Sequence, residues 1–334
     1  MRSDDRNAIA TRSQRDRRVG FQSRCDHAGL TLDHVAIPEM DWSFFLEVLI
    51  GGLLAGVMYS LVALGFVLIY KASGVLNFAQ GAMVFFAALV FVSLVEKKWG
   101  LAGATFGTAA VMVVLAIFVE RMVLRPLVNQ TPISLFMATI GLAFLLEGAS
   151  QGLLGAQVHG LEIGISDVPV EIRGINVSKF DLFAAGVAAL LVVVLAAFFS
   201  RTRIGLALRA VADDHQAALA VGVPLERIWV IVWTVSGFVA LVAGILWGSR
   251  TGVQFSLTFT ALKALPVLIL GGFTSIPGAI VGGLIVGAGE KLAEVYVGPH
   301  IGSGIENWFP YVLATVFLLI RPEGLFGEKR IERV

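Results

Sequence analysis

Charged side chains inside long apolar stretches are the residues of this sequence best suited to do chemistry. They are Glu47, Glu147, Lys263, Glu290 and Lys291. A charge in apolar surroundings is costly, so each of these residues is a functional candidate by default. Glu47 and Lys291 stand near the ends of their stretches, where a long side chain reaches polar surroundings. Glu147 and Lys263 are therefore the stronger candidates to line a polar pathway.

Motifs for catalysis, nucleotide binding and metal binding are absent. The sequence contains no GxxxxGK[ST] and no Gly-Lys dipeptide, so the phosphate-binding loop of a P-loop ATPase is missing. It also contains no HExxH. Its one GxSxG, at residues 148–152, lies inside an apolar stretch and lacks the strand-turn-helix setting of a nucleophile elbow. Its five His residues lie in the N-terminal tail or between apolar stretches, and Cys25 is the only Cys. We expect no catalytic residues, no metal site, no cofactor in this chain and no proton relay.

The composition is that of a membrane protein that crosses the bilayer several times. Hydrophobic residues make up 57% of the 334 residues and charged residues only 15%, whereas a soluble domain is about 25% charged. The net charge of +1 gives no indication of nucleic-acid binding. Apolar stretches cover residues 44–70, 76–95, 101–119, 134–155, 181–199, 228–248, 260–293 and 308–320. Most are near the roughly 20 residues that span a bilayer as a helix. We predict an all-α polytopic protein with about eight transmembrane segments.

The stretch 260–293 is too long for one simple span. Gly271-Gly272 and Pro277-Gly278 interrupt it, and both residue types are unfavourable inside a helix. Two short passes there would return the basic C-terminal tail to the cytoplasm; the alternative is one kinked span. Broken helices within a membrane line cavities or are buried by protein. Gly271 and Gly272 are therefore candidates for the pathway.

Basic residues between the stretches predict the orientation of the chain. They gather after the third stretch and after the fifth, as Arg121, Arg125, Arg201, Arg203, Arg209 and Arg227. Positive charge near span ends favours the cytoplasmic side, so both connectors should face the cytoplasm. The more acidic loop 156–180 should face outward.

The first 39 residues differ from the rest. They are polar and rich in Arg, and no apolar run suits a signal peptide. Met40 directly precedes the first apolar stretch. One hypothesis is that Met40 is the true start and that residues 1–39 are translated upstream sequence. The alternative is a disordered tail before a membrane domain of residues 40–334.

The connector of residues 203–227 has the local signals of two short helices. Residues 203–212 are rich in helix formers. Asp213 can cap a second helix, with Gln216 three positions later. Gly222 and Pro224 are typical of a helix end. Such a connector either docks on a cytoplasmic partner or packs against the membrane and its own bundle.

Glycines four residues apart predict close contacts between helices. The pairs are Gly52 with Gly56, Gly148 with Gly152, Gly278 with Gly282 and Gly283 with Gly287.

Several separated motifs resemble the permease subunits of branched-chain amino acid ABC importers, of the LivH type. The likeness covers about residues 44–327. Its motifs are GVLNFAQGAMVFFAAL (74–89), RPLVNQTPISLFMATIGLAFLLEG (125–148), RAVADDHQAALAVGV (209–223), KALPVLILGGFTSIPGAIVGGLIVGAGE (263–290) and PEGLFG (322–327).

The resemblance implies a heteromeric importer in a bacterial inner membrane. This chain would pair with a homologous second permease and with two cytoplasmic ATPase subunits that bind ATP and Mg. An extracytoplasmic binding protein would deliver the substrate. The motif of residues 209–223 resembles the loop that engages the ATPase, which assigns the coupling role to Arg209, Ala212, Asp213, Asp214, Ala217 and Gly222.

The sequence departs from the family pattern at three positions. Gln80 stands where His is common, Ala82 where Glu is common, and Glu147 where Gln is usual. Asn77 and Gln80 either line the pathway or satisfy backbone groups at a helix end. These departures leave two substrate classes open within the family, branched-chain or related amino acids on one side and urea or short amides on the other. A self-sufficient secondary transporter or channel is the alternative from another class.

Overall fold

The structure is a computed structural model. It describes residues 42–127, 130–155, 157–165, 168–172, 174–213 and 215–327, with the backbone alone for Leu154, Ile172, Asp213, His215 and Gln216. The chain divides into two compact units, residues 1–45 and 46–334. In the first unit, the rings of Trp42 and Phe45 meet edge to face at 6.0 Å. The predicted polar extension 1–39 and the hypothetical start at Met40 lie outside the described residues.

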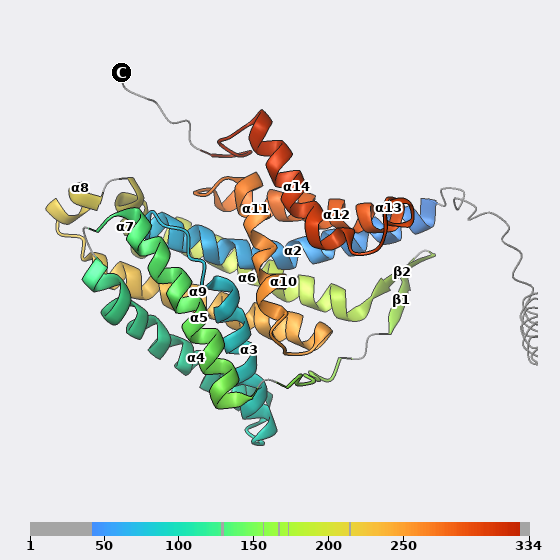
Figure 1. The fold of residues 1–334 in the computed structure, drawn as a ribbon, viewed down its shortest axis with the longest axis horizontal. Helices are drawn as coiled ribbons and strands as arrows, with labels where there is room; N and C mark the ends of the chain where they lie inside the picture. The colour runs from blue at the N-terminus through green and yellow to red at the C-terminus, as the bar shows by residue number, and fades with distance from the viewer. Residues whose placement is uncertain are drawn as a thin grey trace, which may run out of the picture. The chain divides into compact units, whose positions relative to one another are not determined.

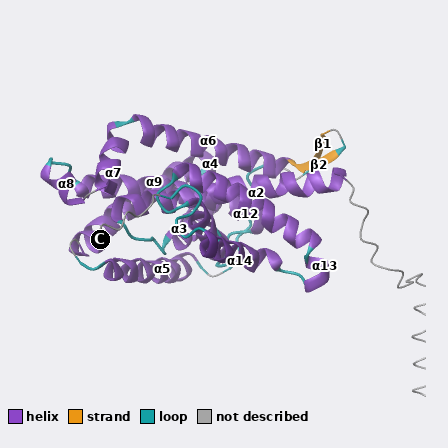
Figure 2. Ribbon diagram, turned by 90° about the horizontal axis from the view of Figure 1, so that it is seen from above, coloured by secondary structure: helices purple, strands orange, loops and turns teal. Residues whose placement is uncertain are grey.

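Helices make up most of the described chain, which confirms the predicted all-α membrane fold (Figures 1 and 2). They are α2 (Trp42–Ser73), α3 (Gln80–Glu96), α4 (Gly100–Phe118), α5 (Pro132–Leu154), α6 (Lys179–Arg201), α7 (Arg203–Asp213), α8 (His215–Ala220), α9 (Leu225–Thr251), α10 (Leu257–Leu262), α11 (Ala264–Gly271), α12 (Ile276–Tyr296), α13 (Gly298–Ile301) and α14 (Ile305–Ile320). A π-helical turn (Val119–Leu124) and a 3-10 turn (Arg125–Leu127) continue α4.

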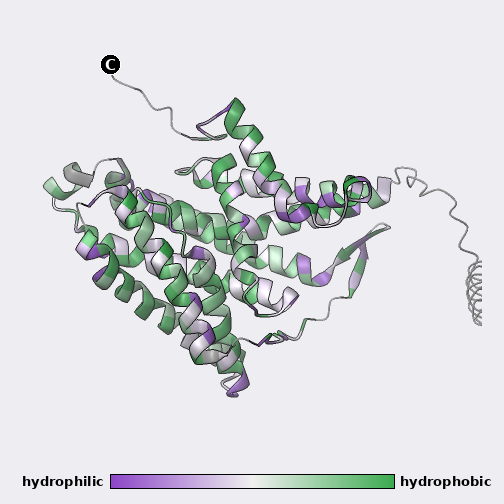
Figure 3. Ribbon diagram, viewed as in Figure 1, coloured by the Kyte–Doolittle hydropathy of each residue, from purple (hydrophilic) through white to green (hydrophobic). Residues whose placement is uncertain are grey.

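Six of the described helices are long and apolar enough to cross a membrane: α2, α4 with its continuation, α5, α6, α9 and α12. Three shorter apolar segments are α3, α10 with α11, and α14. The predicted number of about eight passes stays a prediction, because length and composition alone do not show which short segments cross. Figure 3 shows apolar residues along the long helices and hydrophilic residues mainly near their ends.

The segment 260–293 is broken, as the sequence predicts. Helix α11 ends at Gly271, and Gly272 has a φ of +100°, which favours glycine. Helix α12 starts at Ile276, where the Ser275 hydroxyl accepts a hydrogen bond from the Gly278 amide at 3.0 Å. Pro277 therefore begins α12 and does not interrupt it, as is common for proline in a first turn.

Glycines bring α12 into backbone contact with two other helices. A Cβ added to Gly56 of α2 would lie 2.5 Å from the Gly283 carbonyl oxygen, and one on Gly278 would lie 2.0 Å from the Gly271 carbonyl oxygen. Three of the predicted glycine pairs thus pack tightly. The pair Gly148 and Gly152 on α5 differs, since a Cβ there would have no atom within 4 Å.

The unit 46–334 has two distinct ends. One end carries α7, α8, the α11–α12 turn and residues 321–327, and we call it the connector end. Arg125 pairs with Glu226 there. The other, the hairpin end, carries a short hairpin of β1 (Pro169–Ile172) and β2 (Ile175–Ser178) within the predicted outward loop. Figures 1 and 2 both place α7 and α8 opposite this hairpin.

The two strands were not predicted from the sequence. They pair antiparallel, with Pro169 opposite Ser178, and Gly174 in the turn has a φ of +82°. The loop is also fastened to the end of α9. His159 and Val253 exchange backbone hydrogen bonds, and Asp181 pairs with Arg250 at 2.7 Å.

The last described residues fold back onto the break. The Leu325 amide donates to the Leu270 carbonyl at 2.8 Å, and the Phe326 amide donates to the Gly271 carbonyl at 3.2 Å. Residues 322–327 therefore belong to the bundle and cover the end of α11.

Candidate functional site

A polar cavity of about 670 Å³ lies towards the hairpin end of the unit 46–334. Its walls come from α2, α9, α10, α12 and α14, together with Lys263 between α10 and α11. Its lining includes Tyr59, Trp247, Arg250, Phe259, Lys263 and Glu290. Most helices around it are apolar, so this concentration of polar groups needs a physical explanation.

An ion pair lies in the wall of the polar cavity. The Lys263 ammonium lies 3.1 Å from Glu290 Oε1. Both side chains are largely buried, with 12% of Lys263 and 4% of Glu290 exposed. Removing two charges from water is expensive, and their mutual attraction offsets much of that cost only when geometry is good. At this distance the two opposite charges attract each other, which offsets part of the cost of burying them.

Tyr59 completes this cluster from α2. Its hydroxyl donates a hydrogen bond to Glu290 Oε1 at 3.1 Å. The Tyr59 ring stacks on Trp247 of α9, with centroids 5.3 Å apart and planes 22° apart. The glycine contacts between α2 and α12 allow the two backbones to approach, and so place Tyr59 beside Glu290.

Two buried polar atoms of the polar cavity lack hydrogen-bond partners among the described residues. They are Glu290 Oε2, an acceptor, and Trp247 Nε1, a donor. A buried polar atom without a partner is costly. Both atoms are closed off from solvent although their residues line the polar cavity, so they hold unused hydrogen-bonding capacity beside the cavity.

The rim of the polar cavity carries further charges. Lys291 lies 3.6 Å from Glu306, and Arg250 is held by Asp181. Glu294 fixes the start of α14, because its carboxylate accepts hydrogen bonds from the Gly304 and Glu306 amides at 3.2 and 2.9 Å. This arrangement holds α14 against α12 at the mouth of the cavity.

The predicted pathway residues occupy different places. Lys263 lines the polar cavity. Gly271 and Gly272 lie at the far end of α11, in the turn at the connector end. Glu147 is half-buried on α5 and does not line the polar cavity. Their roles in transport stay predictions, but only Lys263 joins the charged cluster.

Asn77 and Gln80 are fully buried within the helix packing. The Asn77 side chain accepts a hydrogen bond from the Ala79 amide at 3.1 Å and donates to Gln80 Oε1 at 3.4 Å. Ser236 of α9 donates to the same Gln80 oxygen at 2.7 Å. The Asn77–Ala79 contact matches the alternative in which a side chain satisfies a backbone group at a helix end, whereas Gln80 bonds to Ser236 of α9. The roles of both residues stay predictions.

Sequence reasoning did not select Glu290, Tyr59 or Trp247 as pathway residues. Glu290 carried a signal, because it is an acid in the pass that follows Lys263. Tyr59 lies 231 residues from Glu290, and neither tyrosine nor tryptophan is unusual in a membrane helix.

The predicted coupling residues lie on the connector of α7 and α8, at the connector end. Arg209, Ala212 and Ala217 are on these helices, and Gly222 follows them with a φ of +85°. Asp214 and the side chain of Asp213 lie outside the described residues, so the predicted cap stays a prediction.

The connector is anchored by a small apolar cluster. Val211, Ala218 and Leu225 are buried together. Other apolar side chains of the connector are exposed, namely Leu206, Leu219 and Val221. An anchored helix pair with exposed apolar side chains is suited to binding a partner.

A bundle of apolar helices around a charged cavity is the architecture of a membrane permease. The chain belongs to the family described as branched-chain amino acid transport system, permease component, which it matches over residues 48–321. This membership confirms the resemblance inferred from the motifs, and it makes the chain a multi-pass permease component of a transport system.

Named relatives match most of the chain. The high-affinity branched-chain amino acid transport system permease protein LivH of Salmonella typhimurium is 27% identical, over 87% of this chain and 98% of the relative. BraD of Pseudomonas aeruginosa, which carries the same description, is 28% identical over 87% and 98%. A probable LivH of Methanocaldococcus jannaschii is 28% identical over 86% and 95%.

Proposed function

We propose that this chain is the permease subunit of an ATP-driven ABC importer and forms part of the translocation pathway for branched-chain or related amino acids. We infer the substrate class from the buried Lys263–Glu290 pair in the wall of the polar cavity. Charges inside a membrane bundle are rare and mark substrate pathways. A pair beside a cavity is suited to a substrate that carries both charges.

An amino acid presents an ammonium and a carboxylate, and the polar cavity has groups for each. Once the side chains of Glu290 and Trp247 turn towards the cavity, Glu290 Oε2 can accept from the ammonium, while Trp247 Nε1 and the Lys263 ammonium can donate to the carboxylate. Phe259 and the Tyr59 ring offer apolar surface to a branched side chain. Urea and short amides are neutral, so they would gain only charge–dipole hydrogen bonds from the ion pair, whereas an amino acid would also gain charge–charge attraction.

ATP and Mg²⁺ are bound by two cytoplasmic ATPase subunits in this proposal, because the sequence has no phosphate-binding loop. The connector of α7 and α8 docks on them. Its exposed Leu206, Leu219 and Val221 support that role. ATP-driven movement of the ATPases would then shift the connector and switch the access of the pathway.

The remaining partners are a homologous second permease, an extracytoplasmic substrate-binding protein and the lipid of a bacterial inner membrane. Helices α4, α5 and α6 expose large apolar side chains, including Val114, Phe144 and Leu190. Such surfaces must be covered by lipid or by another membrane subunit.

Uptake of labelled leucine into vesicles tests the proposal. The vesicles contain the chain, the second permease and the ATPases, with binding protein outside and ATP inside. Glu290→Gln should raise the KM for leucine at least about tenfold, because a hydrogen bond to a charged group contributes about 1.5–3 kcal/mol. Glu120→Gln is the matched control, since Glu120 is also buried and pairs with Arg125 at 3.2 Å but does not line the polar cavity.

Three results would contradict the proposal. The first is equal KM values for the two variants. The second is strong competition by urea or acetamide with weak competition by valine and isoleucine, which would favour the amide alternative. The third is uptake driven by an ion gradient in vesicles without the ATPases, which would identify a self-sufficient transporter.

A further inference from the structure

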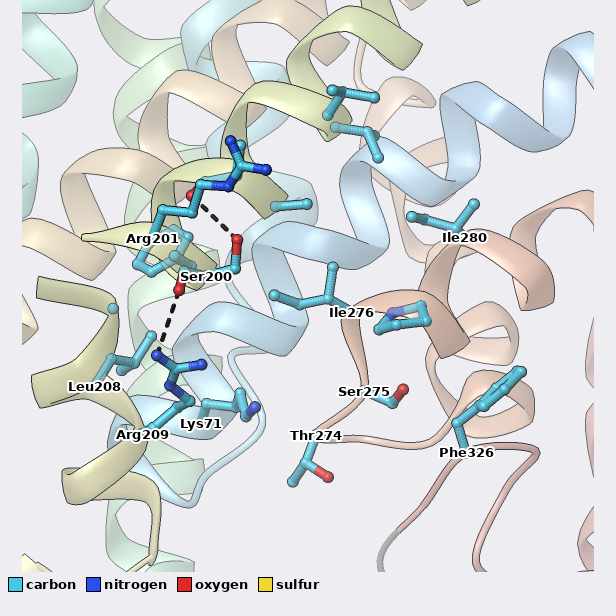
Figure 4. A pocket seen from close by; sticks show the side chains of 17 residues that line it. Lys71, Ser200, Arg201, Leu208, Arg209, Thr274, Ser275, Ile276, Ile280 and Phe326 are labelled. Carbon is cyan, nitrogen blue, oxygen red and sulfur yellow. Dashed lines mark hydrogen bonds between the residues drawn. The ribbon is translucent and has the colours of Figure 1, made fainter. Parts of the chain in front are cut away.

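A second cavity, of about 730 Å³, lies at the connector end and is separate from the polar cavity. We call it the basic cavity. It is bounded by the ends of α2 and α6, by α7, by the turn before α12 and by Phe326. Figure 4 shows Lys71 and Arg209 on one side of it, with Thr274, Ser275 and Phe326 across from them.

Three cationic side chains line the basic cavity: Lys71, Arg201 and Arg209. They come from α2, α6 and α7. None of the three forms an ion pair within the described residues, and no Asp or Glu belongs to the lining. Arg209 makes one long hydrogen bond, 3.5 Å, to the Ser200 carbonyl. Like charges around one cavity repel, so an anion bound among them would lower their energy.

Most of the remaining lining is apolar, and part of it belongs to membrane-spanning helices. Val192, Val193 and Ala196 of α6 line the cavity together with Ile276 and Ile280 of α12. Val193 is 64% exposed although it lies on an apolar span. The lining of the cavity therefore extends from the cationic side chains onto an apolar surface of the membrane-spanning helix α6. A small inorganic anion would contact the cationic side chains and leave this surface uncovered.

We propose that the basic cavity binds an anionic phospholipid, with its phosphate among Lys71, Arg201 and Arg209 and an acyl chain between α6 and α12. Basic pockets between transmembrane helices on the cytoplasmic side have the right chemistry for such headgroups. The lipid would connect α2, α6 and α7, and so hold the connector against the spans. This binding does not depend on the identity of the transported substrate.

Lipid titration of the purified full-length chain tests the proposal. The chain is stripped of lipid in detergent and titrated with phosphatidylglycerol or with phosphatidylcholine of the same acyl chains, and bound lipid is counted by native mass spectrometry. Phosphatidylglycerol should bind at least about tenfold more tightly. The double variant Lys71→Gln/Arg201→Gln should lose this preference. Arg203→Gln is the matched control, because Arg203 is an exposed cation of α7 outside the cavity lining.

Two further arms separate a lipid from a free phosphate. Ala196→Trp fills the apolar part and leaves the cations in place, so it should weaken phosphatidylglycerol binding. Inorganic phosphate at millimolar concentration should not displace the lipid. Full displacement, equal binding of the two lipids, or an unchanged preference in the double variant would overturn the proposal. If the double variant fails to fold, Arg201→Gln alone should show a partial loss, and an unchanged preference there would also overturn it.

Discussion

Tyr59 donates a hydrogen bond to Glu290 across the crossing of α2 and α12, with the two oxygens 3.1 Å apart. The same carboxylate oxygen contacts the Lys263 ammonium. Three separate parts of the chain thus meet at one atom beside the polar cavity. Glycines at this crossing allow α2 and α12 to approach closely. The contact between Tyr59 and Glu290 therefore depends on this glycine packing.

The buried ion pair should behave as a unit in stability. Lys263→Met leaves the Glu290 carboxylate buried without its cation, which should cost about 3–5 kcal/mol. The double variant Lys263→Met/Glu290→Met should recover much of that loss, because neither charge remains. Thermal unfolding of the purified protein in detergent measures both effects. Losses that simply add would show that the two charges do not stabilise each other.

Tyr59→Phe should weaken the cluster without removing the ring. The variant keeps the stacking on Trp247 and loses the hydrogen bond to Glu290, at a cost of about 1.5–3 kcal/mol. We expect a lower melting temperature and a higher KM for leucine. Tyr70→Phe is the control, since Tyr70 packs on Phe273 and does not line the polar cavity. Equal effects of the two changes would argue against a specific role for Tyr59.

Gly56→Ala should separate α2 from α12. Its Cβ would lie 2.5 Å from the Gly283 carbonyl oxygen, a distance that backbone atoms cannot tolerate. Overpacking of this kind costs about 1–3 kcal/mol, and it should also raise the KM for leucine because Tyr59 moves with α2. Gly51→Ala is the matched change, with no atom within 4 Å of its Cβ. Melting curves in which the Gly56 variant is as stable as the Gly51 variant would contradict this packing.

Substitutions of Gly222 test whether the shape of the connector matters for coupling. Its φ of +85° strains any residue with a Cβ by about 1–2 kcal/mol, whereas Asn adopts this conformation more readily. Gly222→Val should reduce ATP-coupled uptake and leave membrane insertion intact, and Gly222→Asn should retain most activity. Uptake assays and membrane fractionation measure the two properties. Full activity of the Val variant would mean that the shape of the connector does not matter for coupling.

Glu147→Gln should be tolerated. Glu147 is half-buried on α5 and does not line the polar cavity. The change keeps the shape of the side chain and removes its charge, so we expect the KM values for leucine and valine to stay within about twofold, less than 0.5 kcal/mol. A selective change for one substrate would place Glu147 on the pathway.

The sequence predicted the features of the fold that local chemistry determines. The apolar stretches are long and continuous, and the residues from Gly271 to Pro277 cannot continue a helix without cost. Helix positions and the break follow directly. The number of complete crossings does not follow, because short apolar helices such as α3 and α14 have the same composition whether or not they span.

The candidate site was predicted only in part. Lys263 was selected because a charge stands out in an apolar stretch. Glu290 was noticed but not chosen, since its pairing with Lys263 depends on how α11 and α12 fold together. For Asn77 and Gln80, the sequence did not decide between two roles. An amide side chain looks the same in sequence whether it lines a pathway or bonds within a core, because the two roles differ only in three-dimensional packing.

The backbone contacts of residues 325 and 326 with the end of α11 affect how the protein is made. These residues are synthesised after α2 to α14. The turn between α11 and α12 therefore gains these two hydrogen bonds only after residues 325 and 326 have been made. A chain that stops before residue 325 would leave the Leu270 and Gly271 carbonyls without these partners.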